Sequence, residues 1–338
     1  MLNWFVLIIF LFISCGKQGP NKNAFNWVNS EQPKGYIYVA TEGGLSISKD
    51  GGLTYSNKTS IINGLGNDGV NTVYVDGNDV IYAGTDGGLS ISKDGGDTFT
   101  NKTTSDGLGD NQVESIKEGA SGTLYIATKG GLTITTDGGV SFSNKTTSSG
   151  LGSGWIRDVS VSSNGTIYAA TGGGLSISTD GGNSFTNKTV ANASLSNNLI
   201  WTVLISTDGV IYAGTNESTA GLQVSTNGGT SFSQKTTSDG LADNHVKQEI
   251  YEDSNKTLYI STWSGLSIST DGASSFSNKT ISHGLGANYT NTIFVDSNKI
   301  YVGTNGGLAL STDGGASFAN DTSADGLGHD QVNDVYVR

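Results

Sequence analysis

The chain is poor in cysteine, proline, methionine and charge. It holds one Cys, two Pro and one Met among 338 residues, and 14% of its residues are charged. A single Cys excludes a framework of disulfides within the chain. The 30 Asp and Glu outnumber the 18 Lys and Arg, which leaves a net charge of −12. Because nucleic-acid binding needs a basic surface, we expect no nucleic-acid partner.

Glycine, in contrast, is abundant. The 50 Gly and two Pro still fall well below the share of roughly a quarter that is typical of disordered low-complexity chains. Hydrophobic residues make up 35% of the chain, and with glycine counted this is an ordinary apolar share for a globular protein. The composition therefore predicts a folded domain with a buried core.

The N-terminus differs from the rest of the chain. Residues 4–13, WFVLIIFLFI, form an apolar run that is too short to span a bilayer and has the length of a signal-peptide hydrophobic region. Ser14 follows, then Cys15, the only cysteine, and Gly16. This arrangement resembles a bacterial lipobox, which implies that residues 1–14 are a signal peptide and that Cys15 is lipidated. An ordinary signal peptide and an uncleaved anchor are the alternatives.

Residues 15–34 show no hydrophobic periodicity and contain both prolines, Pro20 and Pro33. Such a segment is typical of a linker. We interpret it as a lipidated tether that connects the membrane to a domain formed by residues 35–338.

One pattern recurs seven times in residues 35–338. Segments such as SKDGGDTF and STDGGASF are separated by 42 to 47 residues, a period typical of β-propellers. Their third positions are occupied by Asp50, Asp94, Asp137, Asp180, Asn227, Asp271 and Asp313.

Each repeat contains signals for four strands and none for a helix. In the second repeat, residues 70–76, 80–85, 89–92 and 98–103 are short apolar or alternating runs, separated by Gly, Asp and Asn. No window of eleven residues has a helical period. The sequence predicts an all-β fold, a seven-bladed β-propeller with four antiparallel strands in each blade.

The two ends of the domain complement each other. The last eight residues, QVNDVYVR, match the first strand of a repeat, whereas the first repeat begins with YIYVAT, which matches a second strand. We therefore expect the C-terminal strand to pair with the N-terminal blade and close the ring.

The repeated segment, Ser/Thr-x-Asp-x-Gly-x-Ser/Thr-aromatic, resembles the Asp-box, or BNR-like repeat, of bacterial sialidases, sortilin-type receptors and some glucanases; propellers of two-component regulators are of the same general type. The resemblance implies a structural turn between the third and fourth strands, in which Asp accepts backbone N–H groups and Gly supplies a positive φ. The aromatic residues would anchor the turns: Tyr55, Phe99, Phe142, Phe185, Phe232, Phe276 and Phe318.

Catalytic and metal sites are not indicated. Sialidases clamp a carboxylate with three arginines, but this chain has only Arg157 and Arg338. The aspartate turns lack the alternating carboxylates of a calcium loop, and the histidines (His245, His283, His329) lack metal-site spacing. A glycosidase needs a pair of carboxylates. Candidates for such pairs sit at equivalent places in a recurring loop, which favours a turn role: Asp106, Asp110, Asp239, Asp243, Asp325 and Asp330. We expect no catalytic residue, cofactor or metal.

Candidate binding residues are sought where the repeats differ. In a propeller, the loops from the fourth strand to the next first strand, and from the second to the third, open on one face. One loop position is nearly always Asn or Asp and predicts a capping role: Asp68, Asn111, Asn198, Asn244, Asn288 and Asp330, with Gly154 as the exception. The next position and the second loop vary, and they supply our candidate ligand-binding residues: Gln112, Trp155, His245, Trp263, Tyr289 and Gln331.

His245, Trp263 and Tyr289 come from neighbouring repeats, so we expect them to form an aromatic cluster. Such a cluster is typical of an anchor for a peptide or glycan; plugging of the channel is the alternative. Together these features predict a monomeric, extracytoplasmic lipoprotein, held at the cell envelope by its lipid alone, with the outer membrane favoured, that binds protein or glycan without catalysis. The alternatives are a glycan-cleaving enzyme and a periplasmic scaffold for envelope assembly.

Overall fold

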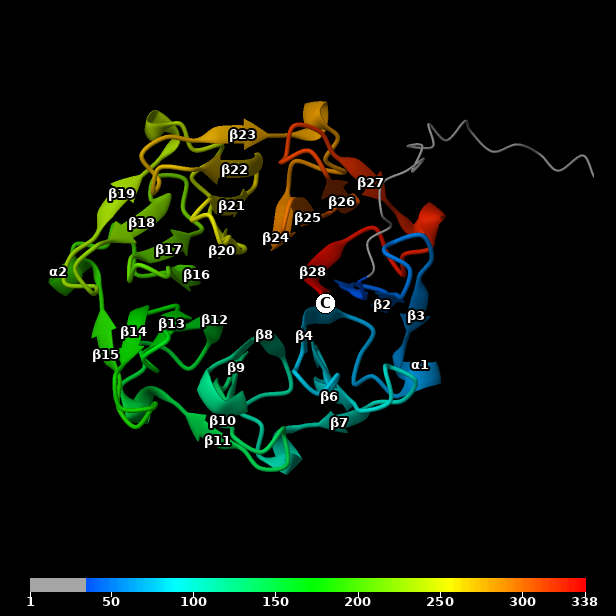
Figure 1. Ribbon diagram of the computed structural model, residues 1–338. Coiled ribbons are helices and arrows are strands. Elements are labelled where there is room, and N and C mark those ends of the chain that lie inside the picture. The colour runs from blue at the N-terminus through cyan, green and yellow to red at the C-terminus, as the bar shows by residue number, and fades with distance from the viewer. Residues whose placement is uncertain (1–34) are drawn as a thin grey trace, which may run out of the picture. The chain divides into compact units, whose positions relative to one another are not determined.

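The computed structural model describes residues 35–338. These residues form seven four-stranded antiparallel sheets arranged as blades around a central axis (Figure 1). The predicted seven-bladed propeller is therefore confirmed. The predicted signal peptide, Cys15 and the tether lie outside the described residues. Within the described part of the chain, no helix has the length and apolar character needed to cross a membrane.

Blade 1 consists of β28 and β1–β3, and blades 2 to 7 consist of β4–β7, β8–β11, β12–β15, β16–β19, β20–β23 and β24–β27. The strands nearest the axis are β28 (Val332–Val337), β4 (Val70–Val75), β8 (Val113–Glu118), β12 (Ile156–Val161), β16 (Ile200–Ile205), β20 (Ile250–Glu252) and β24 (Thr290–Asp296). The second strands are β1 (Ile37–Thr41), β5 (Ile81–Thr85), β9 (Leu124–Thr128), β13 (Ile167–Thr171), β17 (Ile211–Thr215), β21 (Leu258–Thr262) and β25 (Lys299–Thr304).

The third strands are β2 (Gly44–Ser48), β6 (Gly88–Ser92), β10 (Gly131–Thr135), β14 (Gly174–Ser178), β18 (Leu222–Ser225), β22 (Gly265–Ser269) and β26 (Gly307–Ser311). The outermost strands have three residues each: β3 (Ser56–Lys58), β7 (Thr100–Lys102), β11 (Ser143–Lys145), β15 (Thr186–Lys188), β19 (Ser233–Lys235), β23 (Ser277–Lys279) and β27 (Ala319–Asp321). Short outer strands leave little unpaired edge, which protects the rim against pairing with other chains.

The ring closes as predicted. In blade 1, β28 pairs antiparallel with β1, with Ile37 opposite Val337 and Val39 opposite Val335. Beyond this ladder, the N–H of Tyr36 donates to the carbonyl of Arg338 at 2.8 Å, and the reverse bond is 3.0 Å long. The two ends of the described chain therefore belong to one sheet.

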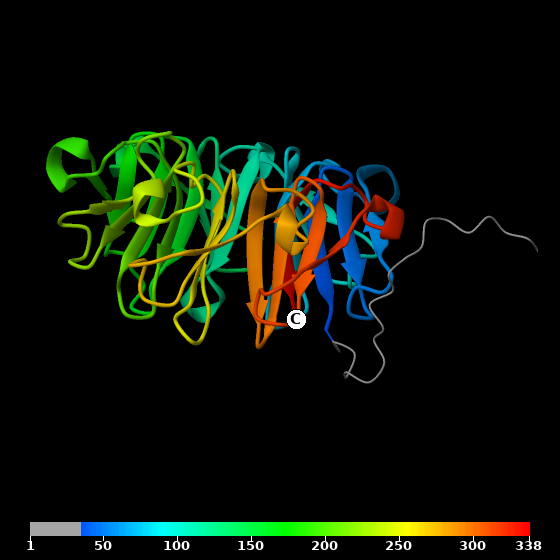
Figure 2. The ribbon, with the colours of Figure 1, turned by 90° about the horizontal axis from the view of Figure 1, so that it is seen from above.

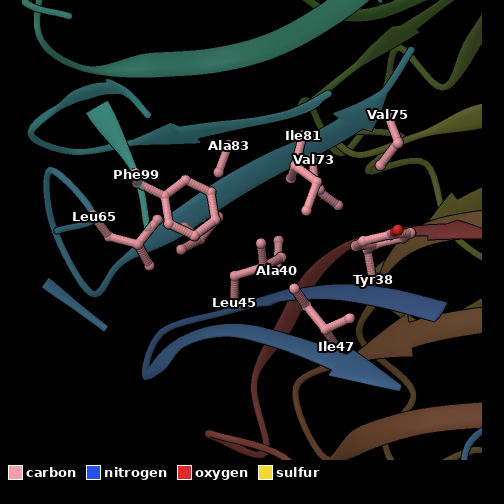
Figure 3. Close-up of a cluster of buried hydrophobic side chains, with 11 residues drawn as sticks. Tyr38, Ala40, Leu45, Ile47, Leu65, Val73, Val75, Ile81, Ala83 and Phe99 are labelled. Carbon is pink, nitrogen blue, oxygen red and sulfur yellow. The ribbon is translucent and has the colours of Figure 1, made fainter. Parts of the chain in front are cut away.

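The core lies between neighbouring blades. Figure 3 shows the cluster between blades 1 and 2, where Tyr38, Leu45 and Ile47 face Ile81 and Phe99. The second and third strands are buried at every position in these blades because each sheet packs against another on both faces. Burying one Leu or Ile side chain contributes about 1.5–3 kcal/mol, so packing between blades is a main source of stability.

The turn between the third and fourth strands has the predicted geometry. In blade 2, the Asp94 carboxylate accepts the N–H of Thr98 at 3.0 Å and its hydroxyl at 2.6 Å, as well as the hydroxyl of Ser92 at 2.7 Å. These bonds hold the pKa of Asp94 well below its usual value. Gly96 adopts a φ of 89°, and a Cβ there would lie 2.5 Å from Cδ1 of Ile47, so glycine lets the turn pack on the preceding blade.

The expectation of no helix is wrong in detail. Each connection between blades contains a single helical turn, α-helical in α1 (Ser60–Asn63) and α2 (Val190–Ala193) and of 3-10 type in η1 (Thr104–Asp106), η3 (Thr147–Ser149), η4 (Thr237–Asp239), η5 (Ile281–His283) and η6 (Ser323–Asp325). Another 3-10 turn, η2 (Ala120–Gly122), lies in blade 3. A Thr before each connecting turn and a left-handed residue after it define the ends, and such short turns leave no hydrophobic period to detect.

Candidate functional site

One face of the ring is formed by the connections between blades and by the turns between second and third strands; Figure 2 shows the ring from the side. The turns share one hydrogen-bond pattern: Thr85 donates its hydroxyl to the carbonyl of Gly88 at 2.9 Å and accepts the N–H of Gly87 at 3.0 Å. The same Thr-to-Gly bond recurs at Thr41, Thr128, Thr171, Thr262 and Thr304. We call this face the loop face.

The nearly uniform Asn or Asp of the connections caps the helical turns, as predicted. Asn111 accepts the N–H of Thr104 at 2.9 Å, and Asn244 accepts that of Thr237 at 2.8 Å. Equivalent bonds are made by Asp68, Asn198, Asn288 and Asp330. The backbone of the loop face is thus fixed by repeated residues, and the variable side chains project from a rigid frame.

The structure brings together the predicted aromatic cluster. His245 stacks on Trp263 with ring centres 4.1 Å apart and planes 7° apart, and Trp263 stacks on Tyr289 at 5.8 Å. The Trp263 side chain is 39% exposed. A large exposed tryptophan in a rigid turn is a feature of binding surfaces.

His245 is held in place by a carboxylate. Asp243 contacts Nδ1 of His245 at 2.6 Å and accepts the hydroxyl of Ser264 at 2.6 Å. Burial opposes ionisation of Asp243, but these hydrogen bonds outweigh it and hold the pKa of Asp243 below its usual value. Because Ser264 bonds the carboxylate rather than the imidazole, the three residues do not form a nucleophile–base pair.

Trp155 belongs to a second group of side chains on the loop face. The guanidinium of Arg157 lies 3.8 Å from the centre of the Trp155 ring and 3.6 Å from that of Trp201. Lys129 lies over Trp155 at 4.7 Å, and Lys247 over Trp201 at 4.6 Å. We call these five residues the cation–indole row. Sequence comparison of the repeats identified Trp155 but missed Arg157, Trp201 and Lys247, which lie on or just before inner strands rather than in the compared loops.

The predicted residues Gln112 and Gln331 do not join either group. Gln331 donates to the Glu42 carboxylate at 3.2 Å, beside Asn333, which donates to the same oxygen at 2.9 Å. Gln112 is partly exposed in blade 3, and the hydrogen bonds found for it involve its backbone.

A ring of polar side chains lines the central channel below the loop face. It surrounds an open cavity of about 110 Å³, whose wall also includes Arg157, Trp201 and Lys247 of the cation–indole row. Lys117 pairs with Glu249 at 3.2 Å, and Thr292 bridges Glu249 and Asp334 at 2.8 and 3.0 Å. Asp158 accepts the hydroxyls of Ser115 and Thr202, and Asp334 that of Thr72, so each carboxylate connects neighbouring inner strands.

The charged side chains of the channel shift each other's pKa values. Burial and the nearby charge of Glu249 raise the pKa of Asp334. Burial works against the charge on Lys117, but Glu249, Asp158 and Asp334 outweigh it and raise the pKa of Lys117. Within the described residues, no group of three His, Cys, Asp or Glu side chains is placed to hold a metal.

The carboxylates of the recurring loop serve its backbone. Asp106 accepts the N–H of Thr103 at 2.9 Å, and Asp239 and Asp325 make the equivalent bonds. Asp110 accepts the N–H of Gln112 at 2.8 Å. Asp243 also accepts the backbone N–H of His245 at 2.9 Å. These bonds, together with that of Asp330 described above, match the turn role inferred from their repetition.

No protein-family model matches the chain, and no curated protein matches it. Solved structures, however, share its propeller fold. One described as YCF48 bound to D1 peptide is 17% identical, with a TM-score of 0.61, and the match covers 85% of this chain and 89% of that one. YCF48 from Cyanidioschyzon merolae is 14% identical, with a TM-score of 0.52 and coverages of 77% and 86%.

The GH74 xyloglucanase from Xanthomonas campestris is also similar. It is 15% identical, with a TM-score of 0.65, and the match covers 84% of this chain but only 50% of the enzyme. The chain thus spans half the length of this enzyme. At such low identities the likeness establishes the class of fold, a β-propeller, which peptide-bound and carbohydrate-active proteins share.

Proposed function

We propose that the protein is a non-enzymatic binding module that engages a protein partner with its loop face. The proposal rests on one observation: on that face, one set of residues fixes the loops and a different set is available for binding. Repeated Thr, Asn and Asp residues fix the loops, while His245, Trp263 and Tyr289 form a stacked group that occurs in one sector and includes an exposed indole. Rigid aromatic side chains bury large areas at little entropic cost, as binding surfaces require.

A protein partner is favoured over a glycan by the ring stacking. His245 and Tyr289 both stack on Trp263, so contacts within the cluster already use indole surface on which a sugar ring would stack. Sugar rings are bound on open aromatic faces, whereas peptide side chains also pack on edges. The likeness to a propeller that holds a peptide is compatible with this preference.

The proposal also places the protein at the cell envelope. The lipobox-like residues around Cys15 and the tether that follows support a lipid-anchored, extracytoplasmic protein. Mass spectrometry of the mature N-terminus tests this part: a diacylglycerol-modified Cys15 is expected, and an unmodified Cys15 would contradict it.

A glycoside hydrolase is the second candidate, because the xyloglucanase shares the fold. Against it, the loop carboxylates are engaged with their own turns. Assays of reducing-end release from xyloglucan and other glucans are expected to show no turnover. A periplasmic scaffold differs from an outward-facing receptor in orientation, and protease treatment of intact cells distinguishes the two.

The binding proposal is tested with two double variants. The full-length protein, a Trp263→Ala/Tyr289→Ala variant and a Leu53→Ala/Val140→Ala control are immobilised and exposed to envelope extract of the producing cells. Leu53 and Val140 are exposed apolar residues in the aspartate turns. We expect one set of proteins to be retained by the unaltered protein and the control but not by the aromatic variant. Identical retention by all three would contradict a role for the aromatic group.

A further inference from the structure

The cation–indole row has charges without counterions. Within the described residues, no carboxylate lies within ion-pair distance of Lys129, Arg157 or Lys247. The carboxylate of Glu114 acts electrostatically on Lys129 and Arg157, and it accepts the indole N–H of Trp155 at 3.2 Å. These two cations therefore share a carboxylate that is already hydrogen-bonded.

The row also contains buried donors without partners. Nε and Nη1 of Arg157 and Nε1 of Trp201 are inaccessible to solvent and have no hydrogen-bond partner in the described structure. Buried polar groups are nearly always paired, and an unpaired one calls for an explanation. All three atoms are donors, so the missing partner is an acceptor.

The opposite sector of the channel mouth is built differently. There Asn71, Asn291 and Asn333 occupy the inner-strand position of Arg157, and each donates to the backbone of the next inner strand. Asn71 and Asn333 also bond Asp86 and Glu42. Their side chains thus bond other parts of the fold. Arg157 and Trp201 stack on each other instead, and Nε and Nη1 of Arg157 and Nε1 of Trp201 have no hydrogen-bond partner within the described residues.

We propose that the cation–indole row binds a carboxylate-bearing segment of a protein, an acidic peptide in extended conformation. This inference rests on the proposed function and names the chemistry of the partner. A carboxylate that reaches the guanidinium of Arg157 would neutralise the cation. A small shift of the neighbouring side chains that uncovers Nε or Nη1 would let the carboxylate form the two parallel hydrogen bonds that it favours with a guanidinium.

Spacing supports an extended peptide. Each Lys shares an indole ring with Arg157, so each neighbouring pair of cationic groups lies within about 9 Å. Alternate side chains of an extended chain point to the same side and repeat at about 6.6–6.8 Å. The repeat of an extended chain falls within this upper limit, so acidic residues at alternate positions suit the row.

The row does not suit stacking of sugars. Arg157 lies over Trp155 and Trp201, and a Lys lies over each ring as well. Two cationic groups thus already lie over each ring on which a pyranose would stack. A peptide carboxylate needs the cations rather than the ring faces, and the observations favour it over an acidic glycan.

The test is calorimetric titration of the full-length protein with a synthetic peptide of alternating Glu and Ser, capped at both ends. The same peptide with Gln for Glu and an oligogalacturonate serve as comparison ligands. Arg157→Gln, Lys129→Gln and Lys247→Gln are compared with Lys93→Gln, which removes an exposed Lys near an aspartate turn. Arg157→Lys keeps the charge without the guanidinium fork, and thermal denaturation verifies that every variant is folded.

We expect the Glu peptide to bind and the Gln peptide to bind at least about tenfold more weakly, since charge-assisted bonds dominate. Arg157→Gln should weaken the Glu peptide about tenfold or more, Arg157→Lys less, and Lys93→Gln not at all. Equal binding of both peptides, insensitivity to Arg157→Gln, or binding of the oligogalacturonate alone would overturn the inference. The retention experiment on Trp263 and Tyr289 would still stand, because it uses natural proteins and a different group of residues.

Discussion

The two faces of the ring carry the same number of loops but use their side chains differently. On one face, the aspartate turns repeat a single hydrogen-bond set seven times, and even Asn227 reproduces it by accepting the N–H of Ser231 at 3.0 Å and donating to its hydroxyl at 2.9 Å. On the loop face, the backbone bonds also repeat, but the side chains above them change from blade to blade. Residues that repeat in every blade maintain the fold, whereas side chains that differ between blades are available to bind a ligand.

Within the loop face, the same contrast separates two sectors. Blades 7, 1 and 2 carry Asn at the second residue of the inner strand, where its amide connects neighbouring strands. Blades 4 and 5 carry Arg157 and Trp201 there. The carboxylates of the channel do not follow this division, because Asp158, Glu249 and Asp334 link neighbouring blades in both sectors.

The largest predicted effect comes from removing the strand on which the whole ring depends. Deletion of residues 331–338 removes β28 from blade 1 and leaves β1 as an unpaired edge, and it takes Val332, Val335 and Val337 out of the core that they form with Ile37 and Val39. We expect the cooperative thermal transition, followed by circular dichroism, to disappear. A truncated protein that melts like the full-length one would show that closure contributes little.

Acid is expected to affect the aspartate-turn face first. Hydrogen bonds from Ser hydroxyls and backbone N–H groups lower the pKa of Asp180, Asp271 and Asp313 to about 2. A folded-state pKa below the unfolded one adds stability above the unfolded value, near 3.8, and this stability is lost as the pH falls through the folded value. The melting temperature should therefore drop steeply below about pH 4.

The channel should respond in the opposite direction. Since the folded-state pKa of Asp334 is raised, its contribution is fully present below the unfolded value and is lost as the pH rises through the folded one. We expect a slight gain in melting temperature from neutral pH down to about pH 5. Asp334→Asn should abolish the gain but keep the acid loss, and Asp180→Asn should reduce the acid loss alone.

A smaller effect is expected from Lys117→Met. The change leaves Glu249 without its cation at 3.2 Å, but 44% of the Lys117 side chain is exposed in the channel. Solvent weakens the pair, so we expect a loss of about 1–3 kcal/mol rather than the 3–5 of a fully buried pair. Lys129→Met, on the loop face and without an ion pair, should change the free energy of unfolding by less than about 0.5 kcal/mol in urea denaturation. Equal losses would mean that the channel pair is not structural.

The repeats made the fold predictable. Asp94 and its equivalents recur in register, and the match of residues 331–338 to a first strand revealed the closure. The same comparison found His245, Trp263 and Tyr289, because they stand where repeats differ within loops.

The channel and the cation–indole row were not predictable in this way. Lys117 and Glu249 are 132 residues apart, and nothing in either repeat indicates that their strands face the same axis at the same height. In the sequence, Arg157 is distinguished only as one of two arginines, too few for a sialidase. Its stacking between two indoles depends on Trp201 in the next blade, and three-dimensional packing alone brings them together.

The smallest predicted effects concern Gln112 and Gln331, the two glutamines among the binding residues predicted from the sequence. The two substitutions should differ in their effect on stability. Gln331 bonds Glu42 and Asn333, so Gln331→Ala should cost up to about 1 kcal/mol of stability. Gln112→Ala removes no side-chain hydrogen bond within residues 35–338 and should cost less than about 0.5 kcal/mol. Because neither residue lies in the aromatic cluster or the cation–indole row, neither substitution should change binding of the Glu peptide in calorimetry. A loss of affinity with Gln112→Ala alone would show that the binding surface extends into blade 3. The difference between the two sectors would then not define the binding site.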